Sequence, residues 1–102
     1  MNKEQLRELL IDKYDYKNSQ VDSVVDKILA FSPPIADSFQ KWLDTGEIDG
    51  LEVEGYTVNS ILKIRPMKTV AAFLALDWLA KDPASAKAAF REPRFNHSVA
   101  GR

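Results

Sequence analysis

The sequence predicts an all-α fold, a compact bundle of about six short helices with one extended acidic connector at about residues 47–56. Apolar residues recur at intervals of three or four through most of the chain, and this spacing places them on one face of a helix. Prolines, glycines and small polar residues divide the pattern into segments of helical length, because these residue types cap or end helices. Only Leu-Glu-Val-Glu at residues 51–54 alternates instead, which is typical of extended chain.

Two helices are expected before the first prolines. The first runs over about residues 3–14, and Asn2 followed three positions later by Gln5 forms a capping pair at its start. The polar stretch DYKNS predicts a turn, after which Ser19 is expected to cap the second helix. The buried stripe of the second helix is expected to comprise Val21, Val24, Val25, Ile28 and Leu29.

A third helix is predicted from the paired prolines at 33 and 34. Proline lacks a backbone N–H, so these residues end the preceding helix but fit the first turn of a new one capped by Ser32. Gly46 stands where a left-handed residue usually ends a helix. The buried face of this helix is expected to comprise Ile35, Phe39, Trp42 and Leu43.

Three more helices are predicted after the connector. Thr57 caps a short helix that ends near Pro66, because the residue before a proline is disfavoured in helical conformation. A longer helix then continues to about Lys81. Asp82 and Pro83 are a cap and a first helical residue, and the alanines that follow favour the last helix.

The composition limits the domain organisation and the setting. A chain of 102 residues with 45% apolar residues has enough material for one core, so we expect a single helical domain over residues 1–92 and a flexible tail over 93–102. Without cysteine nothing calls for an oxidising compartment, no export signal is visible, and the setting is expected to be cytoplasmic. The apolar run at residues 70–80 is too short to cross a membrane, and a net charge of -1 gives no overall attraction to nucleic acid or anionic lipid.

The usual catalytic and cofactor-binding patterns are missing from the sequence. His97 is the single histidine and lies in the expected tail, so the core has no histidine for a Ser-His arrangement. The chain has no cysteine, so it also lacks the thiol of a Cys-His arrangement. The four glycines match neither the dinucleotide-binding pattern nor the phosphate-binding loop. We therefore expect no enzyme, no catalytic residue and no cofactor.

An acidic cluster in the connector invites comparison with a calcium-binding loop. Placing Gly50 at the sixth position of an EF-hand loop puts Thr45 first and Tyr56 twelfth, so both required acidic ligands are missing. No metal site is expected. The cluster is interpreted as a solvated edge, and its functional alternative is a weak docking strip for a basic partner. It comprises Glu47, Asp49, Glu52 and Glu54.

Residues 57–79, TVNSILKIRPMKTVAAFLALDWL, resemble the helix-turn-helix segments of bacterial helix-turn-helix and winged-helix domains. The similarity consists of a capped short helix, a corner of a few residues and a second helix that ends in Leu-Asp-Trp-Leu, and it covers under a quarter of the chain. It implies a nucleic-acid-associated regulator, with contacts from Arg65, Lys68 and the basic last third of the chain.

The residues of this segment favour a different role. Pro66 is restricted to negative φ and cannot provide the left-handed turn residue that the motif uses. Bases are read by polar side chains, and between Val70 and Ala80 the one polar side chain is Asp77, a carboxylate that phosphates repel. A helix that is apolar on every side is normally buried in its domain. Nucleic acid is therefore disfavoured as a partner.

The function that remains is protein–protein contact, as a homo-oligomer or as an adaptor. One candidate surface is the apolar helix, which a second copy would cover, with Leu76 as its test position. The other is the last third of the chain, where residues 66–102 hold six basic and three acidic side chains. Its alternative interpretation is that these cations complement a helix dipole and keep a tail in solution. The candidate residues here are Lys87, Arg91, Arg94 and Phe95.

Overall fold

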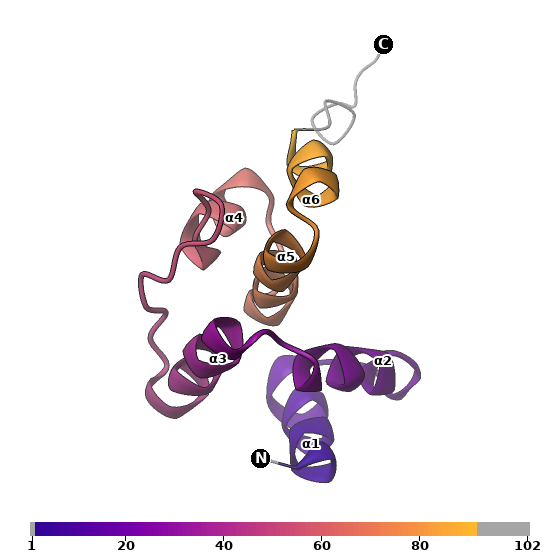
Figure 1. Ribbon diagram of the computed structural model, residues 1–102. Coiled ribbons are helices and arrows are strands. Elements are labelled where there is room, and N and C mark those ends of the chain that lie inside the picture. Colours follow the sequence, from indigo (N-terminus) through magenta and orange to yellow (C-terminus); the bar gives the residue numbers. More distant parts are fainter. Residues whose placement is uncertain (1, 92–102) are drawn as a thin grey trace.

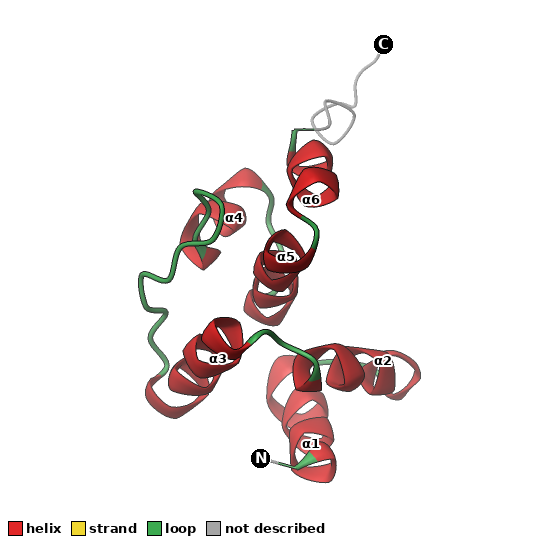
Figure 2. Cartoon of the chain, viewed as in Figure 1, coloured by secondary structure: helices red, strands yellow, loops and turns green. Residues whose placement is uncertain are grey.

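The computed structural model describes residues 2–91, and this part of the chain forms six α-helices (Figure 1). Loops and turns connect them, and this part contains no strand (Figure 2). The predicted all-α fold is confirmed. The helices are α1 (Lys3–Tyr14), α2 (Asn18–Leu29), α3 (Pro33–Thr45), α4 (Val58–Ile64), α5 (Thr69–Lys81) and α6 (Pro83–Phe90).

Most of the packing is between helices that follow one another in the chain. α1 packs on α2, α4 on α5, and α5 on α6. The strongest contact between helices that are not consecutive joins α3 to α5. Figure 1 shows the result, with α1, α2 and α3 in the lower half of the view, α4, α5 and α6 in the upper half, and the connector along the left side.

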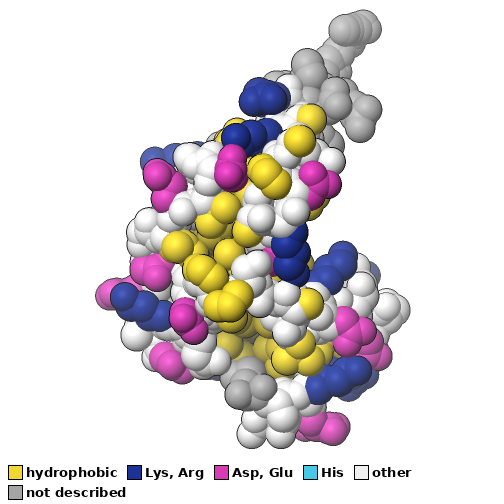
Figure 3. All heavy atoms as spheres, in the orientation of Figure 1, with side chains coloured by type: hydrophobic (Ala, Val, Ile, Leu, Met, Phe, Trp, Pro, Cys, Tyr) yellow, Lys and Arg dark blue, Asp and Glu magenta, His cyan; other side chains and the backbone are white. Residues whose placement is uncertain are grey.

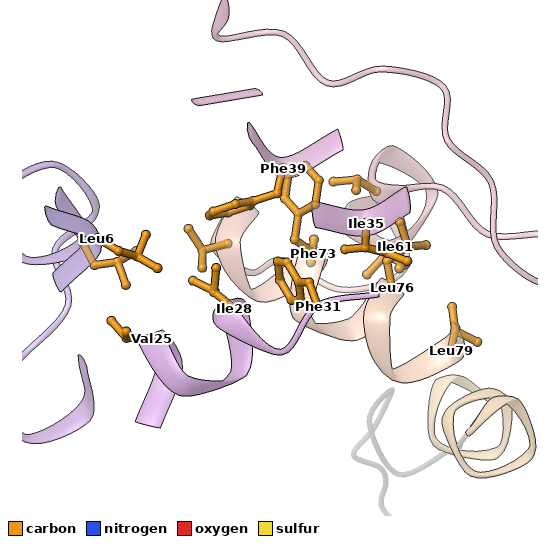
Figure 4. Close-up of a cluster of buried hydrophobic side chains, with 14 of the residues drawn as sticks. Leu6, Val25, Ile28, Phe31, Ile35, Phe39, Ile61, Phe73, Leu76 and Leu79 are labelled. Atoms are coloured by element: carbon orange, nitrogen blue, oxygen red, sulfur yellow. The ribbon is translucent and has the colours of Figure 1, made fainter. Parts of the chain in front are cut away.

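The hydrophobic core is built around α5. Six of its residues are buried, among them Phe73, whose ring packs edge-on against Phe39 of α3 with 5.2 Å between centroids. Figure 4 shows this pair grouped with Phe31, Ile35 and Leu76. No side chain caps the start of α5, so burial of its apolar surface is the main force that holds it in place.

Several local signals act as the sequence predicts. Asn2 accepts a hydrogen bond from the Gln5 amide and Gln5 returns one to the Asn2 amide, which completes the capping box of α1. Thr57 caps α4 in the same way. Gly46 ends α3 with φ of +77°, a conformation that costs glycine little because it has no Cβ.

The start of α2 differs from the prediction. The helix begins at Asn18, its capping position is Lys17, and Ser19 makes no cap. Arg7 of α1 donates hydrogen bonds to the side chains of Asn18 and Asp22, so packing on α1 sets the start of α2. At the other end of α2, Leu29 was expected inside but is 52% exposed.

The connector is extended and ends in a tight turn. Val53 and Tyr56 exchange backbone hydrogen bonds of 2.8 and 2.9 Å across Glu54 and Gly55, which both have positive φ. This single bridge is the only β-type pairing in residues 2–91. The turn brings the end of the connector to the start of α4.

Candidate functional site

An open groove of about 520 Å³ lies between the C-terminal end of α2 and one face of α5. In the space-filling view the surface is hollowed on the right, between the side chains of α5 and those of α2, with lysine or arginine side chains at its mouth (Figure 3). The groove is lined by Lys27 and Ala30 from α2 and its end, and by Leu74, Ala75, Asp77, Trp78 and Lys81 from α5.

The apolar floor of the groove is the face of α5 that its neighbours leave uncovered. Leu74 and Trp78 are four positions apart and so lie one above the other on the same side of the helix. Trp78 is 40% exposed, although its indole packs edge-on against Phe90 of α6 with 6.2 Å between centroids. A large aromatic surface therefore remains open to solvent at the groove.

A buried carboxylate fixes the two walls of the groove to each other. Asp77 is only 6% exposed, and its Oδ1 accepts a hydrogen bond of 2.9 Å from the backbone N–H of Ser32. Its Oδ2 lies 2.8 Å from the ammonium of Lys81, which also donates a hydrogen bond of 2.6 Å to the carbonyl of Ala30. These contacts hold α5 against the corner between α2 and α3.

Sequence reasoning did not assign this role to Asp77. The sequence signal for this role was a single acid within an apolar run. A carboxylate in such a run is buried only where hydrogen-bond donors satisfy it, so a polar network around Asp77 could have been expected. In residues 2–91 no buried side-chain nitrogen or oxygen lacks a hydrogen-bond partner. One donor, Lys81, is four positions away on the same helix, a spacing that the sequence shows, but the other, Ser32, is 45 residues away and only the fold brings it to Asp77.

The sequence suggested two contact surfaces, and the structure shows where the residues of each one lie. Leu76 has no exposed surface and faces the core, so it lines no contact surface, and the uncovered side of the same helix is marked by Trp78. Lys87 is held by an ion pair of 2.7 Å to Glu54 of the connector, while Arg91 is exposed at the end of α6. Arg94 and Phe95 lie outside the described residues.

Two cations named by the helix-turn-helix resemblance contact other helices. The Arg65 guanidinium donates to the carbonyl of Ala89, at 3.4 Å. The Lys68 ammonium donates to the carbonyl of Asp15, at 3.0 Å, and lies 4.2 Å from the centre of the Tyr16 ring. Both contacts join helices that are distant in sequence. Binding of nucleic acid stays a prediction of the resemblance alone.

Two acidic residues of the connector fasten it to helices, Asp49 to α3 and Glu54 to α6. Asp49 Oδ1 accepts hydrogen bonds from the buried hydroxyl of Ser38 at 2.6 Å and from the amide of Leu51 at 3.2 Å. The Ser38 hydrogen bond lowers the pKa of Asp49, and the Leu51 amide adds to this effect. Across residues 2–91 the structure brings together no group of three or more acidic or histidine side chains suited to a metal ion.

Comparisons of the chain with protein-family models, with curated proteins and with solved structures found no match. Among the helices of residues 2–91, none is both long enough and apolar enough to cross a membrane. Function is therefore inferred from the groove and from the charges around it.

We predict that Asp77→Ala destabilises the fold by about 1–3 kcal/mol, because it leaves the Ser32 N–H without its acceptor and Lys81 without its carboxylate. Asp77→Asn keeps an oxygen for the Ser32 amide and should cost less. Urea unfolding followed by tryptophan fluorescence measures both. Equal losses in the two variants would show that the hydrogen bond to Ser32 contributes nothing.

We predict opposite outcomes for glutamate at two neighbouring positions of α5. Leu76→Glu buries an unpaired charge in the core, at a cost of several kcal/mol, and should abolish cooperative folding. Trp78→Glu places the charge at an exposed site and should keep the helical circular dichroism spectrum. A folded monomer from Leu76→Glu, beside an oligomeric wild type, would contradict this assignment of the buried face.

We predict no measurable binding to mixed-sequence duplex DNA at about 50 mM salt, because the uncovered face of α5 is apolar and Lys68 and Arg65 contact other helices. Fluorescence anisotropy at about 50 and about 200 mM salt tests this. Affinity that falls steeply over this range would indicate phosphate contacts and support the helix-turn-helix prediction instead.

Proposed function

We propose that this protein works by protein–protein contact and that the groove between α2 and α5 is its contact surface. The observation that carries the proposal is the exposed indole of Trp78 in the apolar floor of the groove, on a helix whose opposite face is buried in the core. Tryptophan is strongly enriched among the residues that dominate binding energy at protein interfaces. Contiguous exposed apolar surface with a polar rim commonly marks such interfaces.

The polar groups of the groove support binding better than chemistry. Asp77 is the single carboxylate in the lining, and the Ser32 amide and Lys81 occupy both of its oxygens. A general base must be directed at a substrate, whereas this carboxylate is buried and directed at Ser32 and Lys81. The remaining lining side chains are lysine, alanine, leucine and tryptophan, which suit packing and charge recognition.

The groove is formed before any partner binds. The network of Asp77, Lys81, Ser32 and Ala30 holds α5 and the end of α2 at a set separation without an added ligand. A surface that is already ordered loses less conformational entropy on association, which favours affinity. The contact is made either with another protein, in which case the chain acts as an adaptor, or with a second copy of itself.

We expect Trp78→Ala to weaken association at least tenfold, in line with the loss of roughly 2 kcal/mol or more at an interfacial hot spot. Ile64→Ala is the matched control, since Ile64 is a comparably exposed apolar residue on α4 that does not line the groove. Sedimentation of the three proteins over a range of concentration measures self-association. Affinity purification with each immobilised variant, followed by quantification of the cellular proteins that it retains, measures binding to other partners.

The expected result is an association, of either kind, that Trp78→Ala removes and Ile64→Ala preserves. Equal behaviour of the two variants in both measurements would mean that the groove is not the contact surface.

A further inference from the structure

The charges around the groove indicate which kind of partner it accepts. On α2, Asp22 lies 3.1 Å from Arg7 and Asp26 lies 3.5 Å from Lys3, so both acids of this helix pair with α1. Lys27 lies in the last turn of α2, is exposed and lines the groove. It makes no ion pair with any residue from 2 to 91. The α2 wall therefore presents a cation toward the groove.

The opposite wall adds a second ammonium group. Lys81 contacts the Asp77 carboxylate and the Ala30 carbonyl, and a lysine has three N–H donors, so one donor remains beyond these two contacts. Its side chain is 47% exposed. With two lysines and one carboxylate whose oxygens are both engaged, the lining has an excess positive charge beside an apolar floor.

We propose that the groove binds an amphipathic helix of a partner protein that carries a carboxylate opposite Lys27. This inference rests on the proposed function and specifies the partner. Large apolar side chains of the bound helix cover Leu74, Ala75 and Trp78, and an aspartate or glutamate beside them pairs with Lys27. In a helix, residues three and four apart share a face, so one turn supplies both the apolar contacts and the acid.

The form of the groove favours a helix over an extended peptide. Both of its walls are helical, and residues 2–91 include no strand whose edge an extended peptide could join by backbone hydrogen bonds. The chain's own last residues are a poorer match by charge. Residues 92–102 contain Arg94 and Arg102 against Glu92, so their side chains bring more positive than negative charge to Lys27.

A phage-displayed library of helix-forming peptides, randomised along one face, tests this inference on the full chain. The library is panned against the wild type and against Lys27→Glu, Lys13→Glu and Trp78→Ala. Lys13 is the matched control, because it is exposed in the last turn of a helix of the same length and lines no part of the groove. Sedimentation of the wild type, run alongside the selection, measures whether the chain associates with itself.

The wild type and Lys13→Glu are expected to enrich peptides with two large apolar residues at helical spacing and an adjacent acid. Lys27→Glu is expected to enrich lysine or arginine at the position of that acid, and Trp78→Ala to enrich neither class. Peptides selected on the wild type should bind Lys27→Glu about fivefold more weakly at low salt, with a smaller difference at high salt.

Any of the following results would overturn the inference. Apolar peptides that depend on Trp78 but show no preference for acids, or an acidic preference unchanged on Lys27→Glu, would remove the role of Lys27 and leave the proposed function standing. A wild-type dimer that Trp78→Ala dissociates would make a second copy the occupant. Peptides that bind Trp78→Ala as well as the wild type, or no enrichment at all, would remove both the inference and the groove as a contact surface.

Discussion

The junction of α2, α3 and α5 is the feature on which the position of α1, α2 and α3 relative to α4, α5 and α6 depends, and the buried carboxylate of Asp77 is its polar centre. Most helix packing in residues 2–91 joins consecutive helices, which alone would leave the position of α1, α2 and α3 relative to α5 loosely determined. Asp77 accepts the Ser32 amide at the start of α3, and its partner Lys81 donates to the carbonyl that ends α2. Aromatic packing of Phe39 and Trp42 on Phe73 completes the same junction.

The groove follows from this junction and from the composition of α5. The helix is apolar on every side, but its neighbours are short and cover only part of it. The end of α2 lies beside the uncovered face, and Leu74 and Trp78 line the groove between them. A polar network centred on the buried Asp77 thus lies beside exposed apolar surface, and this combination supports a role in binding.

Several cations outside the groove make contacts within the molecule. Arg7, Lys3 and Lys87 pair with acids of other elements, and Lys68 donates to a backbone carbonyl of the α1–α2 corner. Exposed ion pairs of this kind contribute little to stability individually, but they orient helices relative to one another. Lys27 differs from them because it lies at the groove and makes no ion pair with any residue from 2 to 91.

The limits of sequence reasoning are clearest at α5. Helical spacing identified α5 as a helix, and its lack of polar residues identified it as the central core helix, which the structure confirms. The same lack of polar residues left no stripe to distinguish its buried side from its open one. Leu76 and Trp78 are therefore equivalent in the sequence pattern, and packing alone makes one buried and the other exposed.

The sequence by itself determined the six helices and most of their ends, because caps such as Asn2, Thr57 and Gly46 act on residues within four positions of themselves. Only the tertiary structure decided the start of α2, the exposure of Leu29, the hydrogen bond of Asp77 to Ser32 and the position of the groove. These features depend on contacts between residues far apart in the chain, and the local periodicity of the sequence does not reveal such contacts.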